Sequence, residues 1–327
     1  MKLATYHDGS RDGQLVVVSR DLSRAHYATG IATRLQQVLD DWNFLAPQLE
    51  ELSTSLNHGK ARHAFPFEPR RCLAPLPRAY QWADGSAYSS HMQRLRAARG
   101  QPMPEDYLSD PPVYQGGSDD FLGPCADAVF ADAGWGIDFE AELAVVTGDV
   151  AWGTGAQAAL DHVRLLMLAN DWSLRALVPA ELAKGFGFFQ SKPATAFAPV
   201  ALTPDELGAA WRDGRAAVTV EVQVNGRRVG RLDASAGMSL HFGALIAHIV
   251  RTRRLRAGAI VGGGTISEER AEAGIACLAE RRATEAAGGA EPVTPWLAFG
   301  DRVRIEAFDA DGASLFGAID QAVAPPR

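Results

Sequence analysis

The spacing of hydrophobic residues changes within the first 60 positions of the chain. Short aliphatic runs at 2–6 and 14–19 flank the turn-rich segment 8–13, and this pattern predicts a hairpin of two strands. Over 31–56 the apolar positions fall at steps of three and four instead, which predicts an amphipathic helix or helix pair. We expect this helical stretch to break at Pro47, because proline removes a backbone donor.

A proline-rich stretch follows the predicted helices. Residues 65–79 contain four prolines, which restrict φ and lack an amide proton, so we expect an extended connector there. We place a domain boundary in it, which gives domains 1–75 and 76–327. The segment 84–132 has little regular periodicity. A loop of that length inside a compact domain is typically functional or contains short helices of its own.

Downstream of this loop, the apolar pattern predicts a strand-rich domain with few helices. We expect a strand at 137–147 and a helix at about 155–169. Within 217–230, valines alternate before Asn225-Gly226, a dipeptide typical of a two-residue hairpin turn. The predicted fold class is therefore mixed, β-rich α+β, with a small N-terminal β domain before a larger domain of mixed sheets.

The composition is that of an ordinary globular protein, with 47 % hydrophobic and 22 % charged residues among 327. A formal net charge of −7 without a dense basic tract argues against nucleic acid as the main partner. The three cysteines form no C-x-x-C pair, which favours a reducing compartment. No apolar run approaches the ~20 residues that span a bilayer, and the first residues form no signal segment. We therefore expect a cytoplasmic protein without a membrane partner.

Two acids interrupt the apolar residues of the strand predicted at 137–147. Glu140 and Glu142 are two positions apart, so in a strand their side chains would share one face, about 6 to 7 Å apart. Neighbouring carboxylates repel each other and are costly to bury without a partner. A divalent cation such as Mg²⁺ or Ca²⁺ would relieve both costs, because it prefers oxygen ligands. The structural alternative is a solvated strand face.

Three further positions carry candidate chemistry, and each has a structural alternative. Asp171 follows the apolar run 165–169, where it is either a ligand or the cap of a following helix. Asp84 precedes His91 by seven residues, although Asp-Gly alone is more often a turn. Lys192 lies near several phenylalanines, where a lysine is either functional or extends its ammonium to solvent.

Two segments near the C-terminus complete the set. Three glycines at 262–264 precede Thr265, and such a run either brings backbone donors close to an anion or forms a tight turn. Glu280 follows the apolar segment that contains Cys277. Like the acids above, Glu280 in apolar surroundings would need a partner for its charge.

In this order, the segments resemble the fumarylacetoacetate hydrolase family. The resemblance covers about residues 80–320 and rests on five motifs: Phe139-Glu140-Ala141-Glu142-Leu143, Asn170-Asp171-Trp172-Ser173-x-Arg175, the downstream Lys192, Gly264-Thr265-Ile266-Ser267 and Cys277-x-x-Glu280. Each motif alone is weak, but the ordered set is highly specific. The resemblance implies a mixed β-sandwich roll for 76–327.

The resemblance also implies a metal site and a base. Four acids would ligate one Mg²⁺ or Ca²⁺: Asp84, Glu140, Glu142 and Asp171. His91, oriented by Glu280, would activate a water, since a neutral imidazole is a suitable base near pH 7.

The remaining residues of the resemblance would act on the substrate. Arg175 and Lys192 would hold or polarise its oxygens and stabilise developing oxyanions. Tyr114 and Thr265 would contact its carboxylate.

Two departures from the family pattern concern the substrate rather than the chemistry. Val178 stands where fumarylacetoacetase has a glutamine, and the tyrosine near His91 is displaced to Tyr88, which we count as a substrate contact. We predict metal-dependent hydrolysis of a C–C bond in an acylpyruvate or diketo acid of aromatic catabolism. A hydratase, decarboxylase or tautomerase of 2-oxo acids is the alternative. The resemblance further implies a homodimer.

Overall fold

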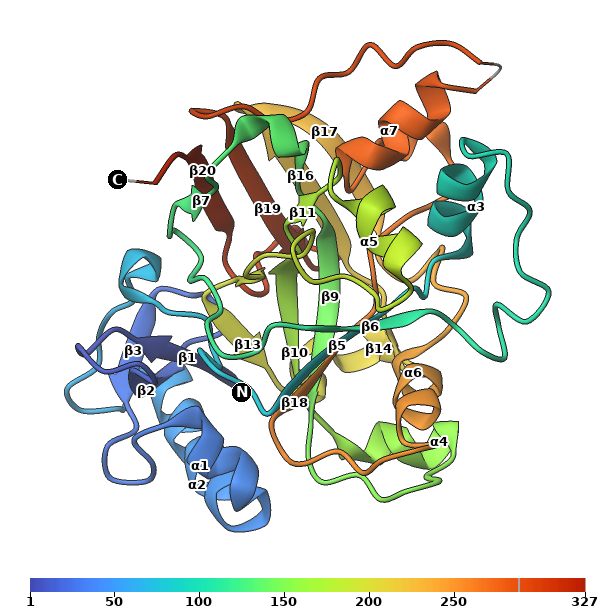
Figure 1. Cartoon of the computed structure of the whole chain (residues 1–327). Helices are drawn as coiled ribbons and strands as arrows, with labels where there is room; N and C mark the ends of the chain where they lie inside the picture. The colour runs from blue at the N-terminus through green and yellow to red at the C-terminus, as the bar shows by residue number, and fades with distance from the viewer. Residues whose placement is uncertain (288, 327) are drawn as a thin grey trace.

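Most strands of the molecule belong to two sheets (Figure 1). The computed structural model describes residues 1–287 and 289–326. The larger sheet has eleven strands in the order β4-β3-β2-β1-β13-β10-β9-β18-β5-β6, with β12 paired to β10. Its strands are β1 Lys2–Tyr6, β2 Gln14–Val18, β3 Arg24–Tyr27, β4 Phe65–Pro66, β5 Gln81–Gly85, β6 Val113–Gly116, β9 Ala141–Thr147, β10 Val163–Asn170, β12 Ala196–Phe197, β13 Val200–Leu202 and β18 Ala259–Gly262.

The smaller sheet has five strands in the order β17-β16-β19-β20-β7. Its strands are β7 Ala128–Val129, β16 Thr219–Val224, β17 Arg227–Asp233, β19 Arg302–Phe308 and β20 Ile319–Ala324. Two short pairs join β8 Ile137–Asp138 to β11 Ser173–Leu174, and β14 Trp211–Arg212 to β15 Arg215–Ala216.

The helices are peripheral to the sheets (Figure 1). They are α1 Leu35–Asp40, α2 Trp42–Asn57, α3 Ser89–Ala97, α4 Ala156–Ala159, α5 Val178–Lys184, α6 Phe242–Ile249 and α7 Leu278–Glu285. Helices α1 and α2 pack against the N-terminal strands, whereas α3, α5 and α7 gather at one end of the larger sheet.

The centre of the larger sheet is buried on both faces. In β9, Leu143 and Val145 belong to a core cluster shared with β16 and β19 of the smaller sheet. Ala144 and Val146 belong to a second cluster, which includes Leu49 of α2. Burial on both faces requires a strand to be apolar at successive positions rather than at alternate ones.

The N-terminal hairpin is confirmed. Strands β1 and β2 pair antiparallel, and β1 also pairs with β13 through Leu3 opposite Ala201. The larger sheet therefore continues from the N-terminal segment into the rest of the chain. The boundary between 1–75 and 76–327 stays a prediction.

The helix predicted at 155–169 is wrong for most of its length. Only Ala156–Ala159 forms an α-helix, and Val163–Asn170 is the strand β10. In β10, Leu166 and Leu168 enter one core cluster while Leu165 and Met167 enter the other. An apolar run buried on both faces carries no period of two, so periodicity did not distinguish it from a helix.

The position of the helix break is also wrong. The helical stretch divides at Asp41, and Pro47 lies inside α2. Near the start of a helix, proline removes one intrahelical hydrogen bond without ending the helix.

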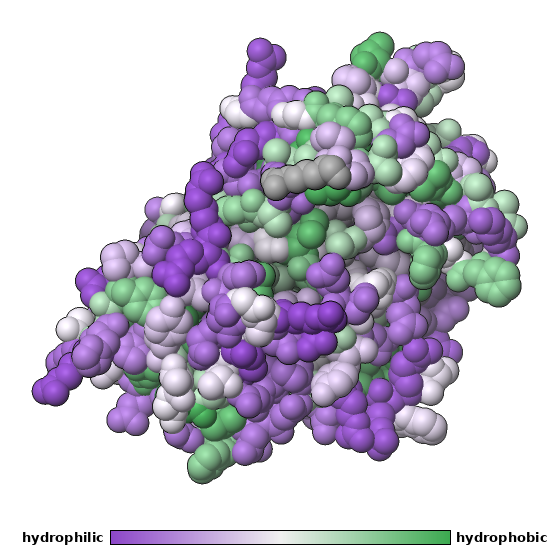
Figure 2. Space-filling model, turned by 60° about the vertical axis from the view of Figure 1, so that its left-hand side comes forward, coloured by the Kyte–Doolittle hydropathy of each residue, from purple (hydrophilic) through white to green (hydrophobic). Residues whose placement is uncertain are grey.

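The hairpin within 217–230 and the β-rich α+β class are confirmed. Strands β16 and β17 pair antiparallel around Asn225 and Gly226, whose φ values are 52° and 73°. No helix among residues 1–287 and 289–326 is long and apolar enough to cross a membrane. Hydrophilic side chains cover most of the face in Figure 2, and hydrophobic ones lie between them in separate patches.

Candidate metal centre and active site

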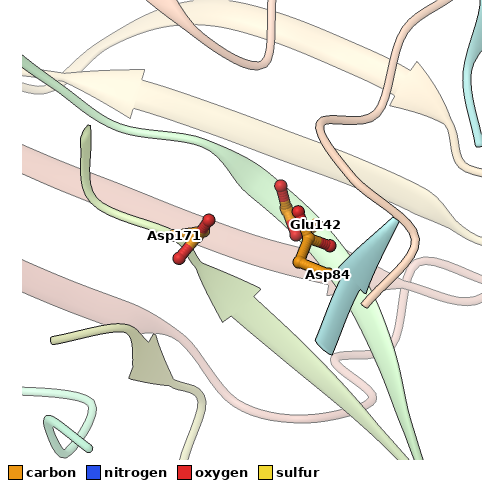
Figure 3. Close-up of side chains that lie close together, drawn as sticks. All are labelled: Asp84, Glu142 and Asp171. Atoms are coloured by element: carbon orange, nitrogen blue, oxygen red, sulfur yellow. The ribbon is translucent and has the colours of Figure 1, made fainter. Parts of the chain in front are cut away.

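Four neighbouring strands of the larger sheet, β10, β9, β18 and β5, meet at the candidate site. Asp84 lies in β5, Glu142 lies in β9, and Asp171 directly follows β10. Strand β18 separates β5 from β9, with Gly262 opposite both Asp84 and Ala144. Figure 3 shows Asp84 and Glu142 close together, with Asp171 at the end of the neighbouring strand.

The three carboxylates form one cluster. An oxygen atom of each of Asp84, Glu142 and Asp171 lies within 4.8 Å of the others, and all three side chains are buried. Burial and the charge of Asp171 raise the pKa of Asp84, and burial and the charge of Asp84 raise that of Glu142. The three buried carboxyl groups therefore have too little positive charge around them to stabilise all of them in the charged form.

The partners of these acids are unequal. Asp171 accepts hydrogen bonds from Tyr114 at 2.6 Å, from Thr195 at 2.6 Å and from Lys192 at 2.6 Å. Asp84 accepts one from the amide of Gly264 at 3.0 Å. In the described part of the chain, both oxygens of Glu142 are buried without a hydrogen-bond partner. Such orphaned acceptors are costly, so the cluster calls for a ligand.

The donor set fits a hard divalent cation. Three carboxylates offer only oxygen, which Mg²⁺, Ca²⁺ and Mn²⁺ prefer over nitrogen or sulfur. A cation at the cluster would also satisfy the orphaned oxygens of Glu142. The residues that would hold it are Asp84, Glu142 and Asp171.

Glu140, the fourth predicted ligand, is held differently. The strand breaks before it, so Glu140 precedes β9 while Glu142 lies within β9. One carboxylate oxygen accepts from Arg175 at 2.6 Å and the other from Lys192. Burial raises the pKa of Glu140, but Lys192 and Arg175 outweigh it and hold that pKa far below its ordinary value. Glu140 is thus a charged anchor for two cations beside the cluster.

Lys192 does not extend to solvent. Its side chain is 8 % exposed, and its ammonium donates to both Glu140 and Asp171. Burial lowers the pKa of Lys192, yet Asp171 and Glu140 raise it above the ordinary value. The ammonium also lies 5.3 Å from the centre of the Tyr114 ring. A fully charged lysine is therefore fixed next to the acid cluster.

Arg175 is tied to two acids, one of which the sequence analysis missed. Its Nε donates to Asp138 at 2.9 Å, besides the bond from Nη2 to Glu140. Asp138 is fully buried and also accepts from the amides of Leu278 and Ala279 at 2.7 and 3.0 Å. It therefore joins Arg175 to the first turn of α7. Its spacing two residues before Glu140 was the available signal.

His91 and Glu280 lie near each other without a hydrogen bond. Nδ1 of His91 is 3.9 Å from Oε1 of Glu280, beyond hydrogen-bonding distance. That oxygen instead accepts from Arg94 at 2.6 Å and from Ser267 at 2.5 Å. Burial lowers the pKa of His91, although Glu280 opposes this. The imidazole is therefore neutral near pH 7.

A cavity of about 390 Å³ opens over these residues. Most of the predicted site residues line it: Asp84, Tyr88, His91, Tyr114, Glu140, Glu142, Arg175, Lys192 and Thr265. Val178 lines it as well. The hydroxyl of Tyr88 donates to the carbonyl of Ala234 at 2.6 Å, so Tyr88 presents its ring rather than an available hydroxyl.

Two arginines at the cavity were not singled out from the sequence. Arg96 and Arg99 follow His91 by five and eight residues, at the end of α3, and both line the cavity. Neither forms a salt bridge with an acid in the described part of the chain, and Nε of Arg96 donates to the carbonyl of Pro102 at 2.6 Å. Burial lowers the pKa of Arg99. Two basic residues shortly after His91 in the sequence were the feature that could have indicated a role at the site.

Comparison with known families agrees with this arrangement. A sequence model described as fumarylacetoacetate (FAA) hydrolase, C-terminal, matches residues 81–324. The chain belongs to the fumarylacetoacetate hydrolase family. A second model, described as fumarylacetoacetase N-terminal domain 2, matches residues 1–78. None of the curated proteins compared with the chain matched it.

Solved structures of this family share the fold over the full length. The fumarylacetoacetate hydrolase of Exiguobacterium antarcticum has a TM-score of 0.66 at 18 % identity, with 100 % of each chain covered. The maleylpyruvate hydrolase of Sphingobium sp. SYK-6, in complex with manganese(II) and pyruvate, has a TM-score of 0.65 at 17 % identity and the same coverage. A 5-carboxymethyl-2-hydroxymuconate delta-isomerase from Mycobacterium smegmatis has a TM-score of 0.61 at 17 % identity, also with 100 % of each chain covered. These likenesses concern the fold.

Replacement of Gly262 by alanine should displace Asp84 of the acid cluster. A Cβ atom there would collide with Oδ1 of Asp84 and with the ring of Trp82. Overpacking of this kind costs about 1 to 3 kcal/mol of unfolding free energy, which urea unfolding measures. Gly30→Ala is the control, because a Cβ atom at Gly30 meets nothing within 4 Å. Equal unfolding free energies for the two variants would contradict the tight fit at Gly262.

Proposed function

We propose that this protein is a metal-dependent hydrolase that cleaves a C–C bond in an acylpyruvate or a 3,5-diketo acid. The observation that carries the proposal is the orphaned carboxylate of Glu142, buried with Asp84 and Asp171 beside a cavity that also holds His91 and Lys192. Buried polar clusters with perturbed pKa values concentrate at functional sites.

The metal is proposed to be Mg²⁺, Ca²⁺ or Mn²⁺, held by Asp84, Glu142 and Asp171. A divalent cation there would supply Lewis-acid chemistry, by polarising the two oxygens of a 1,3-dicarbonyl. Glu140 lies next to these acids and holds Lys192 and Arg175 in place.

His91 is the proposed base. Its Nδ1 lies on the side of Glu280, 3.9 Å from Oε1, so Nε2 is the ring nitrogen that we assign to accept a proton from water. The resulting hydroxide attacks the distal carbonyl carbon of the substrate. The pair of electrons of the broken C–C bond then passes to the departing half as an enolate, which takes up a proton. The departing half is pyruvate from an acylpyruvate and acetoacetate from a 3,5-diketo acid.

Lys192 is the proposed stabiliser of the negative charge that develops on substrate oxygen. Its ammonium is fixed by Glu140 and Asp171 and is charged throughout the physiological range. A preorganised cation in a water-poor site lowers the energy of an oxyanion without having to reorganise. Arg175 lines the cavity, and its Nε and Nη2 donate to acids, so we assign to it positive charge held in a fixed position.

The cavity supports an acidic substrate of modest size. About 390 Å³ accommodates a small diketo acid. Arg96 and Arg99 add positive charge to a wall that is otherwise largely apolar, with Leu95, Val178 and Leu182 among its residues. Val178 has no hydrogen-bonding group to offer the substrate, which favours an acid other than fumarylacetoacetate. The homodimer and the cytoplasmic location stay predictions.

A second candidate reaction is decarboxylation or tautomerisation of a 2-oxo acid. The observation that favours it is the 3.9 Å between His91 and Glu280, because Glu280 already pairs with Arg94 and does not orient the imidazole by a hydrogen bond. The two reactions differ in products. Hydrolysis releases a carboxylic acid together with pyruvate from an acylpyruvate, or with acetoacetate from a 3,5-diketo acid. Decarboxylation releases CO₂, and tautomerisation changes only the spectrum.

The proposed reaction is tested with a panel of acylpyruvates and diketo acids in the presence of Mg²⁺ or Mn²⁺. We expect loss of ultraviolet absorbance of the enol, with one pyruvate formed for each acylpyruvate consumed and one acetoacetate for each 3,5-diketo acid consumed. The protein treated with a chelator should be inactive until the metal is restored. Absorbance loss with neither pyruvate nor acetoacetate formed would contradict hydrolysis and favour the second candidate reaction.

The metal assignment predicts a specific loss of stabilisation. Mn²⁺ at roughly 100 times its Kd should raise the unfolding free energy by about 2.7 kcal/mol, because the ion binds only the folded state. Glu142→Gln and Asp171→Asn should remove most of this rise in thermal unfolding. Asp309→Asn, in the β19–β20 hairpin, should retain it. An unchanged thermal shift in both site variants would reject the shared metal site.

The base assignment predicts that His91→Ala loses hydrolysis but keeps the metal. Removal of a general base typically lowers the rate roughly 10²- to 10⁴-fold. Calorimetry should give a Mn²⁺ affinity close to that of the unmodified protein, since His91 is no proposed ligand. His7→Ala, an exposed histidine, serves as the control. Full hydrolysis by the His91 variant would exclude this mechanism.

The assignment of Lys192 predicts an effect on turnover. Lys192→Met keeps a similar length and removes the charge, so an interaction made mainly in the transition state is lost. Steady-state kinetics should show a large fall in kcat and a smaller change in KM. A rise in KM alone would instead make Lys192 an anchor for the substrate carboxylate.

A further inference from the structure

Glu181 is a buried acid that the mechanism above does not use. It lies in α5 and is 6 % exposed. Its carboxylate accepts from the amides of Phe189, Gln190 and Ser191 at 3.1, 2.6 and 3.0 Å, and also from the hydroxyl of Ser191. Burial raises the pKa of Glu181, but these bonds outweigh it and lower the pKa to about 2. One charged carboxylate thus gathers the donors of three consecutive residues.

The gathered segment leads directly to Lys192. Ser191 is fully buried, and its carbonyl accepts from the amide of Leu174 at 2.9 Å. Ser191 is therefore held from two sides, by Glu181 and by the strand that precedes Arg175. Because Lys192 is the next residue, the same bonds determine where its side chain starts.

Apart from the edge-on contact of the Phe188 ring with Tyr114, at 5.7 Å between ring centres, the chain between Glu181 and Ser191 has little other support. Phe186 is 97 % exposed and Phe189 is 81 % exposed, so their rings are not packed into the core. Gly185 and Gly187 have φ values of 76° and 98°, a backbone conformation that residues other than glycine rarely adopt. An exposed, glycine-containing loop has low local stability, so the carboxylate at its base matters more.

We infer that Glu181 is a positioning residue for Lys192. Its carboxylate fixes the backbone at Ser191, and the lysine stem then reaches Glu140 and Asp171. Without the four bonds, the ammonium would sample other positions. The consequence for turnover rests on the proposed function, whereas the consequence for the placement of Lys192 does not.

The chain contains a matched control for this arrangement. Glu285, at the end of α7, accepts from the amides of Val293 and Thr294 at 3.0 and 2.9 Å and from the hydroxyl of Thr294. The spacings of eight and nine residues equal those from Glu181 to Phe189 and Gln190. Glu285 does not line the cavity, so Glu285→Gln removes the same kind of contact away from the site.

The kinetic test is a double-mutant cycle of Glu181→Gln and Lys192→Met. The amide keeps the size of the side chain but loses one acceptor. Misplacement of a reacting group by about 1 Å costs up to roughly 10²-fold in rate, so kcat should fall about 10- to 100-fold with little change in KM. In the Lys192→Met background, Glu181→Gln should have no further effect, because coupled residues are not additive. Glu285→Gln should leave kcat unchanged in both backgrounds.

The second test needs no turnover. In protein labelled with ¹⁵N-lysine, the ammonium of Lys192 should give a slowly exchanging signal, assigned by its loss in Lys192→Met. Glu181→Gln should remove that signal and Glu285→Gln should keep it, with both variants folded by circular dichroism. If the unmodified protein does not cleave the substrates, the proposed function is wrong, and the Lys192 signal alone then tests whether Glu181 positions Lys192. The inference is overturned if Glu181→Gln keeps the Lys192 signal, or if its loss of kcat persists in the Lys192→Met background.

Discussion

The burial of the Glu142 carboxylate is the constraint on which the site depends. This acid is fully buried among other acids, and neither of its oxygens has a hydrogen-bond partner in the described part of the chain. Burying such a group without a partner is costly, and Asp84 and Asp171 add repulsion. Lys192 and Arg175 compensate Glu140 and Asp171 rather than Glu142. The fold therefore keeps a buried carboxyl group without a compensating partner, and a divalent cation would stabilise its charged form.

The sheet supplies the stability that such a cluster requires. Strands β9 and β10 are buried on both faces by separate core clusters, which fixes their register. Around them, single carboxylates hold the surrounding segments. Asp138 ties Arg175 to α7, and Glu181 ties the segment before Lys192 to α5. The cations beside the cluster are thus positioned by acids outside it.

The acids of the cluster could be predicted from the sequence more readily than Asp138 and Glu181, which hold the segments around it. Glu142 and Asp171 stand out because each follows or interrupts an apolar run, and the structure brings them together with Asp84. The same apolar runs misled the assignment of β10 as a helix, since burial on both faces removes the alternation that marks a strand. Glu140 was expected to share a strand face with Glu142, yet the strand begins after it. Asp138 was missed because its partner Leu278 is 140 residues away, and no local pattern reports such a contact.

We propose that Asp84, Glu142 and Asp171 together hold one divalent cation. Anomalous diffraction from crystals soaked in Mn²⁺ tests it most directly, because the method locates the ion independently of any activity. We expect one strong peak in contact with all three carboxylates, and therefore with the oxygens of Glu142 that have no hydrogen-bond partner. An empty cluster in crystals that contain Mn²⁺ elsewhere, or a peak that does not touch Glu142, would contradict it.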